Sequence, residues 1–175
     1  KNGSDVLTQA VKLSRYCTNK KHVIFGGYHG WHDWVIGSSS RSGGIPEAEK
    51  KISHKFIFND FNSILKLHKK LNGDIACIVM DLVARYYPEK NFLKKVRDFC
   101  SKNKILLVFD EIVTGFRINK GGAQTFFKVT PDLSCFGKAM GNGMPISALV
   151  GKKQYMKKFN DVFYAMNFVG EKASL

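Results

Sequence analysis

Hydrophobic and polar positions along the chain follow the periods of amphipathic helices and short buried strands. Residues 5–17, 61–73 and 92–104 place apolar side chains on one helical face, so each segment predicts a helix. Short apolar runs bounded by glycine, proline or polar residues predict strands. They lie at 22–27, 55–59, 74–83, 105–111, 131–138 and 145–152, with the fifth running into a loop. Because these runs are apolar throughout, we expect strands that are buried on both faces.

The order of these elements predicts one fold class. Helices and strands alternate without an internal repeat, which indicates an α/β fold with a mostly parallel sheet and helices on both faces. Ser4 or Asp5 is expected to cap the first helix. Ligands bind such sheets at the carboxyl ends of the strands. The site is therefore expected where polar and glycine residues gather at those ends, at 26–27, 110–111 and 137–138.

Composition and cysteine spacing narrow the class of protein. The 175 residues are 44% hydrophobic and 24% charged, which is typical of a globular chain. No apolar run is long enough to span a bilayer, and no charged-then-apolar leader is present. We therefore expect a cytoplasmic protein without a membrane partner. The four cysteines form no short pair, which argues against a CxxC metal or redox site and predicts reduced, mostly buried thiols.

The net charge of +14 raises the question of a nucleic-acid partner. Of the 28 basic residues, however, only five are arginine, the side chain best suited to bidentate recognition of phosphate and guanine. The lysines occur as pairs dispersed along the chain, mostly beside predicted helices, as is typical of a solvated face. Nucleic-acid binding remains an alternative that charge alone supports, and we expect no nucleic-acid partner.

Two residues suggest chemistry. Asp110 ends the apolar strand at 105–111, and Lys138 follows 28 residues later in a glycine-rich loop. The apolar residues before Lys138 predict a buried amine with a lowered pKa, which could form a Schiff base with a carbonyl. Each residue also has a structural interpretation, since strand-end acids often cap the next helix and loop lysines usually lie at the surface. The pair favours the chemical interpretation.

Several separated motifs then resemble one family. The chain contains NGSD at 2–5, GYHGWHDW at 27–34, DEIVTGFR at 110–117, GGAQ at 121–124 and PDLSCFGKAMGNGMPISALVG at 131–151. In this order they resemble class-III pyridoxal-phosphate aminotransferases, and in particular the glutamate-1-semialdehyde aminomutase branch. The resemblance implies the type I fold of pyridoxal-phosphate-dependent transferases. It also implies that residues 1–175 are an incomplete large cofactor-binding domain, without the family's N-terminal segment and small C-terminal domain.

The resemblance implies roles for residues around the cofactor ring. Lys138 would hold pyridoxal 5′-phosphate through a Schiff base and then move a proton between the substrate and the cofactor. Asp110 would face the pyridine nitrogen and keep it protonated, so that the ring can accept electrons. Ile112 would press on one face of the ring and Tyr28 would stack on the other.

The phosphate contacts follow the family in one place and depart from it in another. Gly3 and Ser4 would bind the phosphate at a helix N-terminus. Asn167 stands where the family has a threonine that reaches the phosphate of the neighbouring subunit, so it keeps a donor but lacks the hydroxyl. The family's Glu-Pro after a strand is replaced by Asp81-Leu82. The role of His29 stays open between a core histidine and a site residue.

The resemblance implies an enzyme that transfers an amino group from a small-molecule donor to a carbonyl acceptor, as a homodimer and without a metal. Intramolecular transfer by a 2,1-aminomutase uses the same residues and is the alternative. The departures at positions 81–82 and 167 also leave a catalytically inactive member open. The chain alone is expected to be marginally stable, because it would expose surface meant for other segments and a second subunit.

Overall fold

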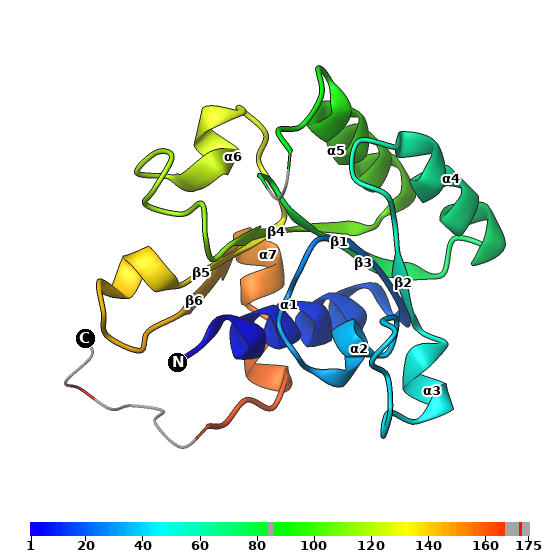
Figure 1. The fold of residues 1–175 in the computed structure, drawn as a ribbon, viewed down its shortest axis with the longest axis horizontal. Coiled ribbons are helices and arrows are strands. Elements are labelled where there is room, and N and C mark those ends of the chain that lie inside the picture. Colours follow the sequence, from blue (N-terminus) through cyan, green and yellow to red (C-terminus); the bar gives the residue numbers. More distant parts are fainter. Residues whose placement is uncertain (84–85, 167–171, 173–175) are drawn as a thin grey trace.

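In the computed structural model the chain forms a single six-stranded sheet with helices on both faces (Figure 1). The structure describes residues 1–83, 86–166 and 172. The strand order is β2-β1-β3-β4-β5-β6, and only the β5–β6 pair is antiparallel. The predicted α/β fold with a mostly parallel sheet is thus confirmed. The strands are β1 (His22–Gly26), β2 (Ser53–Lys55), β3 (Ile75–Asp81), β4 (Leu106–Glu111), β5 (Leu133–Phe136) and β6 (Ala148–Gly151).

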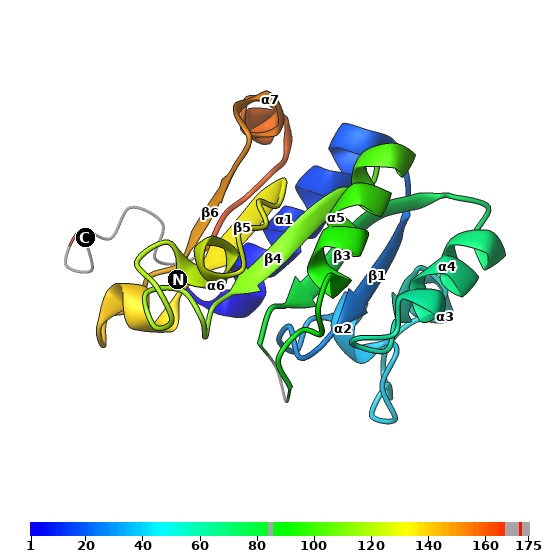
Figure 2. The same cartoon turned by 90° about the horizontal axis from the view of Figure 1, so that it is seen from above.

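The helices divide between the two faces of the sheet (Figure 2). Helix α1 (Gly3–Thr18) covers one face together with the short α7 (Lys153–Met156). Helices α4 (Phe61–Lys70) and α5 (Phe92–Asn103) cover the other, near α6 (Gly122–Phe126). The remaining turns are α2 (Asp33–Ile36), α3 (Glu47–Lys50) and two 3-10 helices at Lys138–Gly141 and Phe159–Asp161.

Two hydrophobic clusters explain why the central strands are apolar throughout. The prediction of burial on both faces is wrong for the edge strands β2 and β6, which are only partly buried. Successive side chains of a strand point to opposite faces. Phe25 of β1 therefore packs with Leu7 of α1, whereas its neighbour Ile24 packs with Ile64 of α4 on the other side. Val108 and Phe109 divide in the same way. Each of the central strands β1, β3 and β4 thus contributes side chains to both hydrophobic clusters. Packing on both faces holds the sheet rigidly and so fixes the positions of the residues at the strand ends.

Local structure differs from the sequence predictions in a few places. The strand predicted at 55–59 is wrong in extent, because pairing stops soon after β2 and Asn59 adopts a left-handed turn. The short helices α2, α3, α6 and α7 and the two 3-10 helices were not predicted. The cap predicted at Ser4 or Asp5 is also wrong. Helix α1 begins earlier, at Gly3, so Asn2 is its N-cap and accepts a hydrogen bond from the Asp5 N–H at 3.0 Å.

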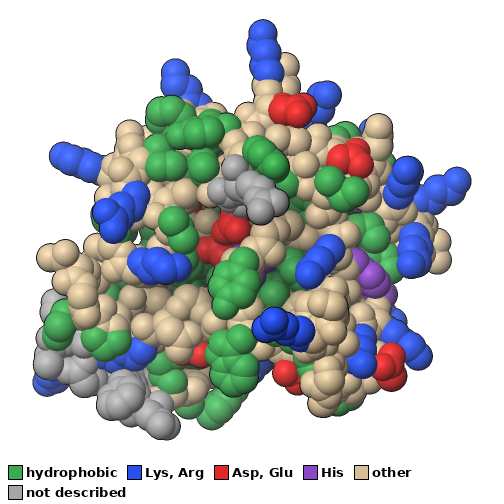
Figure 3. Space-filling model, viewed as in Figure 1, with side chains coloured by type: hydrophobic (Ala, Val, Ile, Leu, Met, Phe, Trp, Pro, Cys, Tyr) green, Lys and Arg blue, Asp and Glu red, His purple; other side chains and the backbone are tan. Residues whose placement is uncertain are grey.

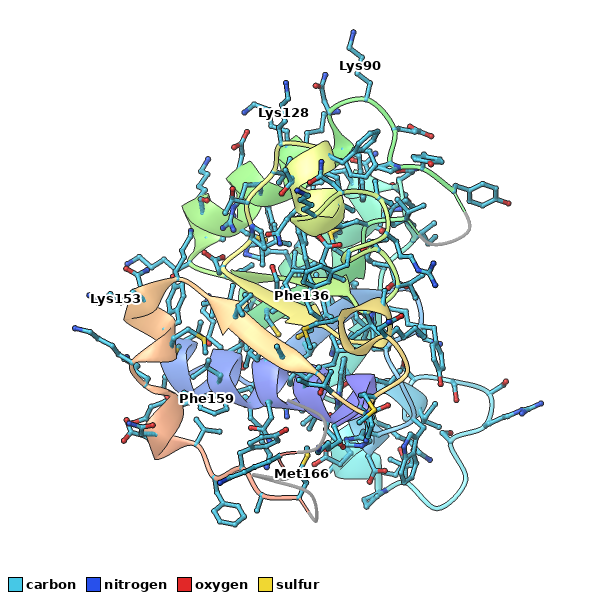
Figure 4. All side chains as sticks on the ribbon, turned by 90° about the vertical axis from the view of Figure 1, so that its left-hand side faces the viewer. Lys90, Lys128, Phe136, Lys153, Phe159 and Met166 are labelled. Atoms are coloured by element: carbon cyan, nitrogen blue, oxygen red, sulfur yellow. The ribbon has the colours of Figure 1, made fainter. Side chains whose placement is uncertain are left out.

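The surface shows how the positive charge is distributed. Lys90 and Lys128 lie near each other and point away from the ribbon, whereas Lys153 points away from it elsewhere (Figure 4). No helix among the described residues is long and apolar enough to cross a membrane. All four cysteines are free, and three of them are buried, as the spacing predicted.

Candidate active site

A pocket of about 720 Å³ opens at the carboxyl ends of β1, β3 and β4, beside the start of α1. Acidic and hydrophobic side chains show next to one another near the middle of this face in Figure 3. The pocket draws its lining from segments that are far apart in the sequence. It brings together six of the predicted site residues: Gly3, Ser4, Tyr28, Asp110, Ile112 and Lys138. The seventh, Asn167, lies outside the described residues.

The start of α1 provides groups suited to an anion. The first intrahelical hydrogen bond is donated by the Val6 N–H to Asn2, so the N–H groups of Gly3 and Ser4 precede the helical ladder. Such N–H groups and the helix dipole favour a negative charge. Gly30 packs so closely against Ser4 that a Cβ at position 30 would collide with the hydroxyl. The pocket therefore has a close-packed floor with polar groups at one end.

Asp110 lines the same pocket and is almost fully buried. Its Oδ1 accepts a hydrogen bond from the Ile112 N–H at 3.0 Å, while its Oδ2 lies 2.7 Å from Nδ1 of His29. Because Asp110 is the penultimate residue of β4 and Ile112 comes directly after the strand, the turn fixes the carboxylate and the apolar side chain together. The buried Ile112 contributes an apolar surface to the same pocket.

The sequence left His29 open between a core histidine and a site residue, and the structure supports both roles. The ring is buried between Phe25 and Trp34, and it also contacts Asp110. Its second nitrogen, Nε2, lies 3.0 Å from the carbonyl oxygen of Gly26. Burial lowers the pKa of His29, but the hydrogen bond and charge of Asp110 outweigh it, so that this pKa stands above its ordinary value. His29 is therefore both a core residue and a partner of the site.

Asp81 is a site residue that the sequence reasoning noted only as a departure. The β3–β4 register pairs it directly with Asp110, and its Oδ2 accepts a hydrogen bond from the Tyr28 N–H at 3.2 Å. Burial raises the pKa of Asp81 to about 6. The charge of His29 and the Tyr28 N–H oppose this rise, whereas the charge of Asp110 and a hydrogen bond with its side chain add to it. The sequence does contain a signal for Asp81, because an acidic residue at the end of a buried strand is the same pattern that singles out Asp110.

Asp81, Asp110 and His29 also offer ligand atoms that all lie within 4.8 Å of one another, a set that could hold a metal ion. Both ring nitrogens of His29 already face hydrogen-bond acceptors, so a metal bound to His29 would have to displace Asp110 or the Gly26 carbonyl. The arrangement favours a hydrogen-bonded cluster.

Lys138 lines the pocket, but its predicted burial is wrong. The side chain is exposed, because β5 ends at Phe136 and the 3-10 helix that begins at Lys138 projects beyond the sheet. The residue adopts a left-handed conformation with φ of 41°, which is uncommon for a residue with a side chain and often marks functional sites. Tyr28 is also exposed, by 72%. The described residues thus form the floor and one wall of the pocket.

Comparison with known proteins gives these features a family. The model of the class-III aminotransferase family matches residues 1–173. The chain is 41% identical over 175 residues to 3-aminobutyryl-CoA aminotransferase of Cloacimonas acidaminovorans, covering 96% of this chain and 42% of that protein. It is 36% identical over 192 residues to glutamate-1-semialdehyde 2,1-aminomutase of Methanocaldococcus jannaschii, covering 99% of this chain and 45% of that protein.

Solved structures agree with this assignment. The internal-aldimine form of the Sphingopyxis FumI protein, a structure that contains pyridoxal phosphate, superposes with a TM-score of 0.88 at 30% identity, over 96% of this chain and 42% of that one. An omega-transaminase from Sphaerobacter thermophilus gives a TM-score of 0.86 at 26% identity, over 95% and 44%. The chain spans less than half the length of each of these four proteins. It belongs to the class-III aminotransferase family.

Proposed function

We propose that the protein containing this chain transfers amino groups with pyridoxal 5′-phosphate. The observation that carries the proposal is the meeting of three features in one pocket: an anion-binding helix start, a buried carboxylate at Asp110 and a lysine at position 138. The residues fit the cofactor chemically, since it combines a phosphate, a pyridine nitrogen and an aldehyde. The close contact at Gly30 supports the fit, because a side chain there would collide with the Ser4 hydroxyl at the phosphate end.

Each residue then has a defined task. The N–H of Gly3 and the hydroxyl of Ser4 bind the phosphate. Asp110 would hold a proton at the pyridine nitrogen, and Ile112 and Tyr28 would contact the two faces of the ring. When bound, the cofactor supplies an electron sink for a bond broken at the carbon that carries the amino group.

The pocket lysine has two tasks. The amine of Lys138 would hold the cofactor by condensing with its aldehyde, which releases water. Once a substrate amine has taken its place, the freed amine would hold the proton removed from the substrate. Its exposure in the described part of the chain is consistent with a pocket whose outer wall comes from elsewhere. We propose that residues 1–175 are part of the large cofactor-binding domain, that the whole protein is a homodimer, and that Asn167 reaches the phosphate of the second subunit.

The substrates are a small-molecule amino donor and a carbonyl acceptor. Intramolecular transfer, as in a 2,1-aminomutase, is the second candidate, and it is favoured by the identity to the Methanocaldococcus jannaschii enzyme. The free cysteines suit a reducing compartment, which supports a cytoplasmic location.

Reductive trapping of the cofactor tests the proposal. Full-length protein is incubated with pyridoxal 5′-phosphate, reduced with borohydride and digested, and the modified peptide is identified by mass spectrometry. We expect the phosphopyridoxyl group on Lys138, and its loss in Lys138→Ala but not in the exposed control variant Lys128→Ala. A label found on another lysine, or an equal label in both variants, contradicts the assignment.

Turnover then separates the two activities. With a ¹⁵N-labelled amino donor, an aminotransferase passes the label to a different molecule, whereas an aminomutase keeps it on a neighbouring carbon of the same skeleton. Absence of any transfer from a panel of amino donors, with the cofactor bound at Lys138, identifies an inactive member.

A further inference from the structure

Asp110 shares the end of the sheet with a second carboxylate. The β3–β4 register sets Asp81 opposite Asp110, and both side chains line the pocket. Two carboxylates at neighbouring strand ends repel each other, and burial strengthens the repulsion. Such a pair needs cations to be stable, and one cation is already present at His29.

The hydrogen bonds of His29 indicate its protonation state. Nδ1 faces the Asp110 carboxylate and Nε2 faces the Gly26 carbonyl, so both ring nitrogens point at acceptors. A neutral imidazole can donate from only one nitrogen. The two contacts are satisfied together by an imidazolium and an ionised Asp110, because Asp110 Oδ1 also accepts from the Ile112 N–H. His29 therefore offsets the negative charge that Asp110 would present to a pyridinium.

Asp81 can restore that charge. Its carboxylate is held by the turn after β1, through the Tyr28 N–H, and a Cβ on Gly27 would collide with it. We propose that Asp81 is a positioning residue for the cofactor's ring nitrogen: beside Asp110 it supplies the second negative charge, so that Asp110 can hold an imidazolium on one side and a pyridinium on the other. This inference rests on the proposed function. It gives a task to the aspartate that stands where the family usually has glutamate.

The charges around Asp81 are consistent with this balance. The ionisable groups that act on it are His29, from the loop after β1, and Asp110, from β4. Lys1 and Lys138 line the same pocket. With Asp81 ionised, the cluster of His29, Asp81 and Asp110 carries one net negative charge, which a protonated pyridine neutralises. With Asp81 neutral, the cluster carries none, and a pyridinium would add an uncompensated charge.

A cofactor analogue isolates this effect. In 1-deazapyridoxal 5′-phosphate a carbon replaces the ring nitrogen, while the phosphate and aldehyde are retained. Dissociation constants of both cofactors are measured for the full-length wild type, for Asp81→Asn, and for Asp33→Asn, which removes an exposed carboxylate outside the pocket. We expect Asp81→Asn to weaken pyridoxal 5′-phosphate by about tenfold, the effect of losing one partly screened charge, and to change the deaza analogue by less than about twofold.

Other outcomes of this experiment would contradict either the role of Asp81 or the proposed function, and the two cases can be distinguished. If Asp81→Asn weakens both cofactors equally, or neither, Asp81 does not act through the ring nitrogen. If the wild type binds neither cofactor, the proposed function itself fails. Because Asp81→Asn could misfold, ¹⁵N NMR of histidine-labelled wild type provides a second test. Both ring nitrogens of His29 should be protonated at about pH 8, above the ordinary histidine pKa. A deprotonated nitrogen there overturns the charge balance.

Discussion

Glu111 anchors the loop beside the pocket, and its replacement by glutamine tests how. The side chain is fully buried. Its carboxylate accepts hydrogen bonds from the N–H groups of Ala123 at 2.9 Å and Gln124 at 2.8 Å, and from the Thr114 hydroxyl. The two N–H groups belong to the first turn of α6, whose N-cap is Gly121. The capping role expected of a strand-end acid thus falls to Glu111, which leaves Asp110 for the pocket.

The structure gives the size of the effect of Glu111→Gln. The amide places an NH₂ group where one carboxylate oxygen now accepts, so one hydrogen bond to a charged group, worth about 2 kcal/mol, is lost. The other two bonds change from charged to neutral, at a cost of about 1 kcal/mol each. The expected total is about 4 kcal/mol, which places this variant among strongly destabilising substitutions.

Hydrogen exchange of the full-length protein, followed by mass spectrometry of peptides around α6, measures this loss. Since about 1.4 kcal/mol corresponds to tenfold, protection in this region should fall by about three orders of magnitude. The matched control is Asp98→Asn, which removes an exposed carboxylate paired with Lys94 and should change protection by less than about threefold. Unchanged exchange around α6 in Glu111→Gln would refute the capping argument.

Two further perturbations test other parts of the structure. Gly30→Ala should lower the free energy of unfolding, measured by urea titration, by about 2–4 kcal/mol and weaken cofactor binding. The reason is that Gly30 has a φ of +99° and a Cβ there would collide with Ser4. Gly43→Ala is the control, because a Cβ at position 43 meets open space and should leave the stability unchanged. Acidification should destabilise the fold at the contact of His22 with His54, whose ring nitrogens lie 3.0 Å apart. Burial lowers the pKa of each histidine, and the charge of His22 lowers that of His54 further. Below about pH 6.5 the unfolded chain therefore binds more protons than the folded chain, and the stability falls as the pH drops. The urea midpoint should fall less steeply with decreasing pH in His54→Gln than in the wild type.

The sequence predicted the elements that are defined by local pattern. Residues 74–83 and 105–111 are continuous apolar runs, and both became central strands, β3 and β4. The order of the strands and their register depend on contacts between distant segments, which no local period encodes. The pairing of Asp81 with Asp110 is such a contact. For that reason Asp81 was noticed as a departure from a motif and not as a member of the site.

The prediction for Lys138 failed for a related reason. Apolar neighbours in the sequence favour burial of Lys138. In the structure, however, Phe136 is the last residue of β5, whereas Lys138 begins a 3-10 helix beyond the strand. Neighbours along the chain therefore differ in environment wherever a strand ends. What the motif order did capture is the grouping, because Lys138, Asp110 and the start of α1 line one pocket.

The cluster at the strand ends shows how charge can restrict what a pocket accepts. Asp81 and Asp110 are neighbours because the sheet register makes them so, and their repulsion persists as long as both are ionised. His29 offsets only one of the two charges. The position in front of Asp110 therefore favours a cation that can also donate a hydrogen bond, and a protonated pyridine meets both requirements. A ring without that nitrogen could fill the same volume, but it would leave the second charge uncompensated. Under the proposed function, the cluster would therefore select for the protonated heterocycle as well as for its shape.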